Sequence, residues 1–538
     1  MAHHHGSESY FVEGEGLLGE AVGGRDVRPI ATAASGDGAD APPFRFSRMG
    51  PKGQGKQHAE AIHKKLALAM TRGGGGPGSM PGGYTYLGQF VDHDLTFDKT
   101  TVALGDSIPP SELEQARSPS LDLDSLYGAG PGDAESAKFY SDGVHLKVGS
   151  TDALGGGDLI AREGYDLPRG TTGSNANKRK ANIPDHRNDE NLAVAQTHLA
   201  MIRFHNKVVD KLPNAMPATE KFGKARDSVT KHYQWMLRND YLPRIVAPAI
   251  VNDVFNNGRK VFEKNAPATK VPTMPIEFSV AAFRLGHSMI RDSYDWNAEF
   301  PGTAGTLTFL FIFSGTSGDM FGGPKLPANW TVDWRRMYDF KKDLNRDDLK
   351  PPAKVNKAMR IDTRLANTLS NLPKGSTGDA DGTPAIFADL AFRNFERGKM
   401  VKLATGQQMA QFMRGKGVNV KTLTKAQLRD GNGGAELDNL TQAQRDAVLK
   451  NTPLWFYVLR EAELNGGKLT GVGGRIVAET FHRAIQGSAA SIIRDPAFKP
   501  SLGPDNKTFR MTDLLMVAFE SKKNLLAPLG DKGGGQPG

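Results

Sequence analysis

The chain contains no cysteine among its 538 residues. Disulfide bonds, thiolate nucleophiles, cysteine-ligated zinc sites, iron–sulfur clusters and thiolate-ligated haem are therefore excluded. A chain without cysteine is compatible with both oxidising and reducing compartments. The absence thus restricts the chemistry of the protein more than its location.

Long hydrophobic runs are also missing. The longest, LTFLFIF at residues 307–313, is far too short to span a bilayer. The N-terminal residues have no apolar core of the kind that a signal peptide needs. We therefore expect no membrane span, and a protein that is cytoplasmic or secreted without a leader.

Positive charge is in excess but is not concentrated. The chain has 68 Lys and Arg against 59 Asp and Glu, a net charge of +9, and its densest basic cluster is NKRK at residues 177–180. Nucleic-acid-binding proteins usually cluster their basic residues on one face. We therefore expect no nucleic-acid partner, and at most weak attraction to anionic surfaces.

Helical periodicity dominates the chain, and strand signals are few and short. Apolar residues recur at spacings of three and four at residues 191–212, 275–291, 389–413, 452–464 and 474–485, the last after the turn signal GVGG. We predict an irregular N-terminal arm at 1–42, one domain at 43–525 and a disordered glycine-rich tail at 526–538. The fold class is mainly α, a single large domain with long loops and little β structure.

The stretch GQFVDHDLTFD, residues 88–98, is rich in side chains that could form a site. On a helix, Gln89, Asp92 and His93 share one face, while Asp94 is turned away by about 100°. One face thus offers an amide, a carboxylate and an imidazole, and another offers a lone carboxylate. A solvated acidic helix start would explain the same pattern.

Oxygen donors alternate in SPSLDLDSLYG, residues 118–128. Ser118, Ser120, Asp122 and Asp124 lie at two-residue steps, and calcium prefers six to eight oxygen ligands. The stretch is not an EF-hand, because its glycine and glutamate positions do not match. An ordinary acidic turn is the alternative interpretation.

Two further stretches carry one pair of candidates each. In HRNDENLAVAQTH, Arg187 and Glu190 lie about one helical turn apart, a spacing that is more often a surface ion pair than a catalytic device. In FRLGHSMIR, His287 follows Arg284 by one turn on a mostly apolar helix face, where a histidine is usually a packed core residue. Spacing alone cannot join these distant segments into one site.

In this order, the stretches resemble the animal-type haem peroxidases, the superfamily that includes myeloperoxidase and the cyclooxygenases. The resemblance runs from about residue 81 to about residue 485 and is carried by GQFVDHD, DLDSLYG, RNDENLAVAQTHLAMIRFHN, FRLGHS and LAFRNFERG. The segments TPLWFYVLREAEL and GGRIVAE look like the bacterial branch. The resemblance implies a helical peroxidase domain with haem bound between helices.

The resemblance also implies roles for individual residues. His93 matches the distal histidine, Gln89 the distal amide and Arg187 the distal arginine, which together form the catalytic set. His287 matches the proximal ligand of the haem iron, and Asn394 the asparagine that hydrogen-bonds its other ring nitrogen. Arg284, one turn before the proximal histidine, belongs to the expected haem-binding set.

Two further features follow from the same resemblance. Asp92 and Glu190 match the carboxylates that form ester links to haem b, and Asn191 stands where a methionine would form a third, sulfonium link. The expected calcium ligands are Asp94, Ser118, Ser120, Asp122 and Asp124.

The implied function is the reduction of hydrogen peroxide with oxidation of halides or small organic donors, by a monomer. A fatty-acid dioxygenase of the same superfamily is one alternative, but the radical-forming tyrosine expected three residues before the proximal histidine is here Arg284. The other alternative is a non-catalytic, calcium-stabilised adhesion module.

Overall fold

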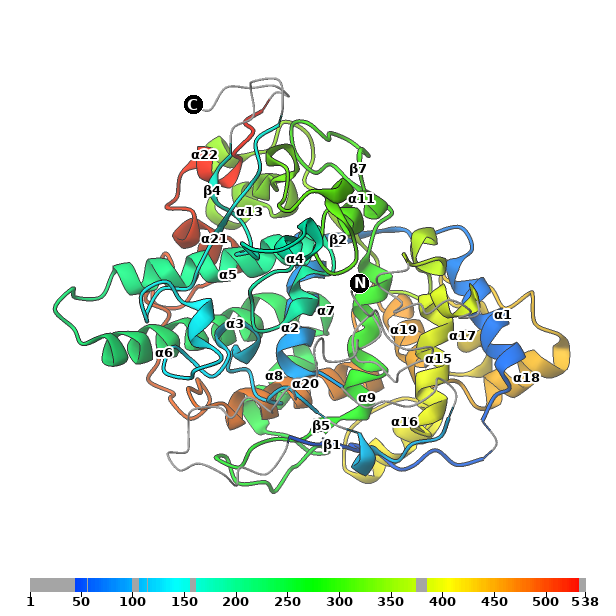
Figure 1. Ribbon diagram of the computed structural model, residues 1–538. Helices are drawn as coiled ribbons and strands as arrows, with labels where there is room; N and C mark the ends of the chain where they lie inside the picture. Colours follow the sequence, from blue (N-terminus) through cyan, green and yellow to red (C-terminus); the bar gives the residue numbers. More distant parts are fainter. Residues whose placement is uncertain are drawn as a thin grey trace.

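Helices far outnumber strands in the computed structural model (Figure 1), which describes residues 44–55, 57–98, 106–113, 115–154, 161–373 and 385–531. The predicted arm at 1–42 and the last seven residues lie outside the described residues. The α-helices are α1 Glu60–Thr71, α2 Gly83–Leu95, α3 Asp124–Tyr127, α4 Asn175–Arg179, α5 Leu192–Asp210, α6 Ala218–Met236, α7 Leu242–Ile245, α8 Pro248–Asn257, α9 Ile276–Ser279, α10 Gly286–Met289, α11 Leu307–Ile312, α12 Trp334–Met337, α13 Phe340–Leu344, α15 Leu390–Met400, α16 Gly406–Gly415, α17 Lys425–Asp430, α18 Gln442–Lys450, α19 Leu454–Leu464, α20 Gly471–Gly487, α21 Met511–Ala518 and α22 Lys523–Leu526.

Strands are short and occur only in pairs within the described residues. Antiparallel pairs join β2 Pro77–Pro81 to β8 Lys357–Met359, β3 Gly149–Ser150 to β4 Glu163–Asp166, and β6 Ser293–Tyr294 to β7 Gly305–Thr306, while β1 Phe46–Ser47 pairs in parallel with β5 Met274–Pro275. The predicted mainly α fold with little β structure is therefore confirmed. None of the described helices is long and apolar enough to cross a membrane.

Helix α2 lies at the centre of the molecule, with the long helices α5 and α6 on one side and the segment around α19 and α20 on another (Figure 1). It packs against α3, α5, α10 and the 3-10 helix η3 His186–Asp189. Every residue of α2 except Gln89 is buried. A helix that is buried on all sides belongs to the core of a large domain, so its polar residues must find partners inside the protein.

The segment 275–291 is not the continuous helix that its periodicity predicts. It forms α9, the 3-10 helix η5 Ala282–Leu285 and α10, and Ala281 between them has non-helical angles of φ −134° and ψ −72°. The Ser279 carbonyl accepts a hydrogen bond from Arg284 Nε at 2.7 Å. In a continuous helix, this carbonyl would accept a hydrogen bond from the backbone N–H of residue 283. Here the side chain of Arg284 donates to it instead.

Glycines that we interpreted as a turn signal lie inside α20, which begins at Gly471. A Cβ on Gly473 would come within 2.8 Å of Val458 on α19, and one on Gly474 within 2.9 Å of Ile250 on α8. These glycines therefore allow α20 to lie close to α19 and α8. The local sequence does not reveal this role, because the contacting residues are distant in the chain.

The predicted tail boundary at residue 526 is wrong. Helix α22 extends to Leu526, Ala527 and Leu529 are buried, and Asp531 accepts a hydrogen bond from Arg335 at 2.6 Å. The apolar residues just before the glycine run therefore continue the packed core as far as Leu529, and Arg335 binds the exposed Asp531 beyond it.

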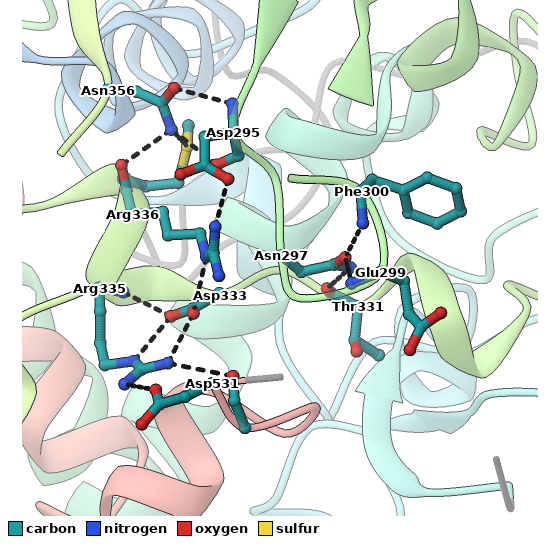
Figure 2. A network of polar contacts seen from close by, with 12 residues as sticks. Asp295, Asn297, Glu299, Phe300, Thr331, Asp333, Arg335, Arg336, Asn356 and Asp531 are labelled. Atoms are coloured by element: carbon teal, nitrogen blue, oxygen red, sulfur yellow. Dashed lines mark hydrogen bonds and ion pairs between the residues drawn. The ribbon is translucent and has the colours of Figure 1, made fainter. Parts of the chain in front are cut away.

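A buried network of charged residues connects this C-terminal segment to the loops around α12 (Figure 2). Asp333 accepts hydrogen bonds from Arg335 at 2.8 and 3.0 Å and from Arg336 at 3.1 Å. Arg336 also bonds Asp295, and Arg335 bonds Asp531. Asp333 is the shared acceptor for two arginines that are almost fully buried, so its charge is needed to balance both.

We predict that Asp333→Ala lowers the free energy of unfolding by about 3–5 kcal/mol, because it leaves two buried guanidinium groups without their shared partner. Asp348→Ala is the matched control, since Asp348 pairs with Arg346 at the surface and an exposed pair contributes at most about 1 kcal/mol. Urea unfolding of both variants tests this. Equal losses of stability in the two would contradict the prediction.

Candidate active site

A cavity lies between α2 and the η5–α10 segment. Helix α2 contributes positions 85, 88, 89 and 92, which share one helix face. The η5–α10 segment contributes Arg284 and His287, and apolar surface completes the wall. The lining residues are Thr85, Gly88, Gln89, Asp92, Tyr241, Phe283, Arg284, Gly286, His287 and Ile290.

His287 is buried and is held from behind by Asn394 on α15, 107 residues away in sequence. Its Nδ1 lies 2.8 Å from Asn394 Nδ2, and Asn394 Oδ1 is buried without a hydrogen-bond partner in the described residues. A 180° rotation of the Asn394 side-chain amide exchanges the positions of its oxygen and nitrogen. Asn394 Oδ1 then accepts a hydrogen bond from His287 Nδ1–H. In that arrangement His287 Nε2 carries the lone pair that a metal ion requires.

His93 is fully buried on α2 and points toward η3. Its Nδ1 donates a hydrogen bond to Asn188 Oδ1 at 2.9 Å, and its Nε2 lies 3.6 Å from Glu190 Oε1. Because an amide oxygen only accepts, this bond places the proton of a neutral ring on Nδ1 and the lone pair on Nε2. His93 is therefore oriented and its tautomer is set.

Glu190 and Gln89 connect this histidine to the cavity. The Gln89 amide nitrogen donates to Glu190 Oε1, and its oxygen accepts from Asn191 Nδ2 at 2.9 Å. Gln89 lines the cavity, whereas His93, Glu190 and Asn191 do not. The predicted residues of α2 and the 187–191 segment thus form one connected cluster, with Gln89 and Asp92 as its edge on the cavity.

Arg187 lies in the 3-10 helix η3, and Glu190 is the residue that ends it. The two are therefore not on one α-helical face, because α5 begins only at Leu192 after its capping residue Asn191. Arg187 donates to Asp185 at 2.7 and 3.1 Å and to the carbonyl oxygens of His93 and Thr96. Its guanidinium group is thus fixed directly against the helix that carries His93.

Asp185 balances the charge of this arginine. Burial by itself would raise the pKa of Asp185, but Arg187 and Arg117 beside it hold the pKa well below its usual range. Arg117 Nε donates to Asp185 at 2.9 Å. Asp185 is therefore ionised, and it orients Arg187 as part of a buried group of three charges.

Arg284 and Asp92 both line the cavity and lie close to each other. Arg284 NH1 lies 3.7 Å from Asp92 Oδ2, and both side chains are nearly buried. Position 284 therefore carries a fixed positive charge beside His287, where the dioxygenase alternative requires a phenol.

The predicted calcium ligands gather on the opposite side of α2. Asp94 accepts a hydrogen bond from Ser125 at 3.1 Å, Asp124 accepts from the Ser118 backbone, and Asp122 accepts from the Ala489 backbone. Burial and mutual repulsion raise the pKa of Asp94 well above its usual value, and burial raises that of Asp122 to about 7 and that of Asp124 to about 6. The two-residue alternation ends at Asp124, because α3 begins there.

The fit of these residues to a cation is partial. In the described part of the chain, no three histidine, aspartate or glutamate side chains are placed together as a metal site. Asp94 Oδ2 and Asp124 Oδ1, however, are buried without a hydrogen-bond partner there. Two such oxygens fit a cation whose remaining ligands are hydroxyl and carbonyl oxygens.

Three residues of this site were not predicted from the sequence. Asn188 orients His93, Asp185 holds Arg187, and Tyr241 lines the cavity. Asn188 and Asp185 flank Arg187 in the segment PDHRNDEN, so their polarity at buried positions was the available signal. Tyr241 has no local signal, because it ends the π-helical segment 237–241 before α7, and only packing brings that segment to α2.

The family model and the similar proteins found by comparison are all described as peroxidases or peroxidase-like. The family model described as animal haem peroxidase matches residues 92–308. A peroxidase-like protein of Margaritifera margaritifera is 31% identical over 114 residues, 21% of this chain and 14% of that protein. Heme peroxidase 2 of Caenorhabditis elegans is 25% identical over 182 residues (32% and 23%), and thyroid peroxidase of Rattus norvegicus 27% over 175 residues (32% and 19%). The chain thus matches less than a quarter of the length of each of these relatives.

Solved structures extend the likeness of the fold over nearly the whole chain. Peroxidase A from Dictyostelium discoideum superposes with a TM-score of 0.57 at 15% identity, covering 92% of this chain and 95% of that one. A fatty acid alpha-dioxygenase from Arabidopsis thaliana superposes with a TM-score of 0.54 at 12% identity, covering 92% and 79%. At such low identity these likenesses concern the fold alone.

Proposed function

We propose that this chain is a haem-dependent peroxidase of the animal haem peroxidase superfamily, whose family model matches residues 92–308, and that it reduces hydrogen peroxide and oxidises halides or small organic donors. Membership of the family supports an oxidoreductase. The finer assignment rests on one observation above all: His287, held by Asn394, faces the cavity that Gln89 and Asp92 of α2 line from the other side.

The residues around this cavity fit a haem. His287 is the one imidazole among the described residues that line it, and a haem iron is commonly held by one histidine whose second nitrogen is hydrogen-bonded. When bound, the haem would supply the redox chemistry at its iron.

His93 is the proposed acid–base residue. With its Nδ1 proton donated to Asn188, the neutral ring has its lone pair on Nε2. Such a nitrogen can take a proton from one oxygen of hydrogen peroxide and return it to the other, the leaving oxygen. Arg187 would stabilise the negative charge that develops there, since it is oriented beforehand by Asp185 in a site of low dielectric.

The dioxygenase alternative finds support in the fold but not in the site. The tyrosine position expected for that activity carries Arg284, which lies 3.7 Å from Asp92 and cannot form a phenoxyl radical. The adhesion-module alternative offers no reason for a buried histidine whose tautomer is set by Asn188. The peroxidase proposal explains both features.

We predict that His93→Ala and Arg187→Ala each slow peroxide reduction by about 10²–10⁴-fold while haem stays bound, because each removes a group acting on the transferred proton or charge. His198→Ala is the control, since His198 is a buried neighbouring histidine of α5 outside the proposed machinery. Stopped-flow spectroscopy measures the rates. Rates within a few-fold of the original protein, or oxygen consumption with a fatty acid in place of peroxide turnover, would contradict the proposal.

The attachment of haem is a second proposal. Asp92 lines the cavity, and Glu190 accepts a hydrogen bond from Gln89, which also lines it. The proposed links would use these two carboxyl groups, which come from separate elements. An ester to a haem methyl would remove a costly buried charge at each. Asn191 caps α5 through its contact with Val194 and bonds Gln89, and it cannot form a sulfonium link.

We therefore expect at most two ester links, formed when the protein turns over with peroxide. Acid–acetone extraction and intact-mass measurement should show haem retained by the protein after peroxide treatment and released from the Asp92→Ala, Glu190→Ala double variant. Each single variant, which should retain one link, is the matched control. Haem that is fully extractable from the treated original protein would refute covalent attachment.

A structural calcium ion is the third proposal, supported by the buried oxygens of Asp94 and Asp124 that lack partners. Asp94 adjoins His93 on α2, so a cation there would fix the rotation of the helix. Ser118, Ser120 and Asp122 would supply further oxygens from the neighbouring loop.

We predict that desalted protein retains calcium, and that a strong chelator lowers the stability of the fold by about 3 kcal/mol, the effect of losing a ligand present at about 100 times its Kd. Thermal unfolding with and without chelator measures this. In Asp94→Ala, which should contain no calcium, the chelator should have no further effect. Metal analysis that finds no calcium in the original protein would refute the site.

A further inference from the structure

A second cavity is bordered by Asn394, the residue that bonds His287. Its wall includes Asn394, Phe395, Lys399 and Trp455, and Gln54 at its edge is exposed to solvent. The residue that bonds His287 therefore also forms part of this cavity. Nothing in the proposed peroxide chemistry uses the space.

Trp455 connects this cavity to the proximal histidine. Its indole ring is 98% buried, lines the cavity, and lies with its centroid 6.4 Å from that of the His287 ring at an angle of 75°. Its Nε1–H donates to the Arg284 carbonyl at 3.3 Å. An indole is among the side chains most easily oxidised by one electron, and this hydrogen bond allows an oxidised ring to keep its proton.

The polar part of the wall offers a proton acceptor. His58 Nε2 donates to the carbonyl of Asn451 at 2.7 Å, so the lone pair of the neutral ring lies on Nδ1. Burial lowers the pKa of His58 below its usual value, which keeps the ring neutral near pH 7. The neighbouring His63 is instead bound to Glu396 at 2.7 Å.

The rings of Phe395 and Trp455 form part of the remaining wall, which also includes aliphatic residues such as Val280, Leu403 and Leu454. The ring of Phe395 packs on that of His63 at 5.4 Å and meets Trp455 edge-on at 5.2 Å. Flat aromatic surfaces of this kind recognise another aromatic ring, because offset and edge-on ring contacts are favourable beyond the area that they bury. A small phenol can meet both these rings and the polar groups of the wall.

We propose that this cavity binds a small phenol as electron donor and that Trp455 carries the electron from it to the haem side at His287. The inference rests on the proposed peroxidase function, which supplies the oxidant, a haem oxidised by hydrogen peroxide. Trp455 gives one electron to that oxidant and becomes an indole radical cation. The phenol then gives one electron to Trp455 and its hydroxyl proton to His58 Nδ1, leaving a neutral phenoxyl radical and the restored indole.

Gly398 permits a test of binding that leaves the redox residue untouched. It lines the cavity on α15, and a Cβ there would meet Leu403 Cδ1 at an ordinary 3.5 Å. Gly398→Ala is therefore tolerated, and Gly398→Leu extends into the space. With 2-methoxyphenol as the probe, calorimetry of the haem-loaded protein without peroxide should show Kd raised at least tenfold in Gly398→Leu and changed less than threefold in Gly398→Ala.

Trp455→Phe tests the electron path, with Trp235→Phe, a tryptophan that bonds Lys507 near the surface, as its matched control. Freeze-quench electron paramagnetic resonance after peroxide addition without donor should show a tryptophan radical in the original protein and in Trp235→Phe, and none in Trp455→Phe. The ratio of 2-methoxyphenol to iodide oxidation rates should fall at least tenfold in Trp455→Phe and stay unchanged in Trp235→Phe.

The outcomes separate this inference from the function on which it rests. If the original protein oxidises neither iodide nor 2-methoxyphenol with peroxide, the peroxidase function itself is wrong. If it oxidises both, but Gly398→Leu binds the phenol as before, or Trp455→Phe keeps the radical signal and the rate ratio, the second donor site is wrong and the peroxidase function stands.

Discussion

The burial of α2, at every residue except Gln89, is the constraint on which the rest of the site depends. A buried helix cannot leave its polar side chains to water, so each of them must meet a partner on a neighbouring element. Gln89 meets Glu190, His93 meets Asn188, and Asp94 meets Ser125. These contacts point in different directions around the helix, and together they define its rotation.

The two histidines of the site illustrate how a second residue sets the chemistry of an imidazole. Asn188 accepts from Nδ1 of His93, which leaves the lone pair on Nε2. Asn394 occupies the corresponding position behind His287, where its amide can act as donor or acceptor. An asparagine behind each ring thus orients the imidazole without adding a charge, unlike the aspartate that holds Arg187.

Asn394 also links two spaces that differ in character. The cavity in front of His287 is bordered by carboxylate, amide and guanidinium groups, whereas the one beside Asn394 includes the rings of Phe395 and Trp455 in its lining. Trp455 contacts both regions, through Arg284 on one side and Phe395 on the other. The helices α15 and α19 that carry these residues come late in the chain and pack on the η5–α10 region, so the proximal side depends on a long-range assembly.

The sequence by itself determined the helical class, the long helix at residues 192–210 and the set of candidate residues, because helical periodicity and side-chain chemistry are local properties. It could place Gln89, Asp92 and His93 on one face, and the resemblance could relate His287 to Asn394. Only the tertiary structure decided that residues 275–291 break into three short helices, that the glycines at 471–474 lie inside α20, and that residues 526–529 are packed. Each of these depends on partners distant in sequence: Ser279 with Arg284 across a break, Val458 and Ile250 against the glycines, and Arg335 with Asp531. The partners Asn188, Asp185 and Trp455 were likewise set by packing, since periodicity shows which face of a helix is buried but not what covers it.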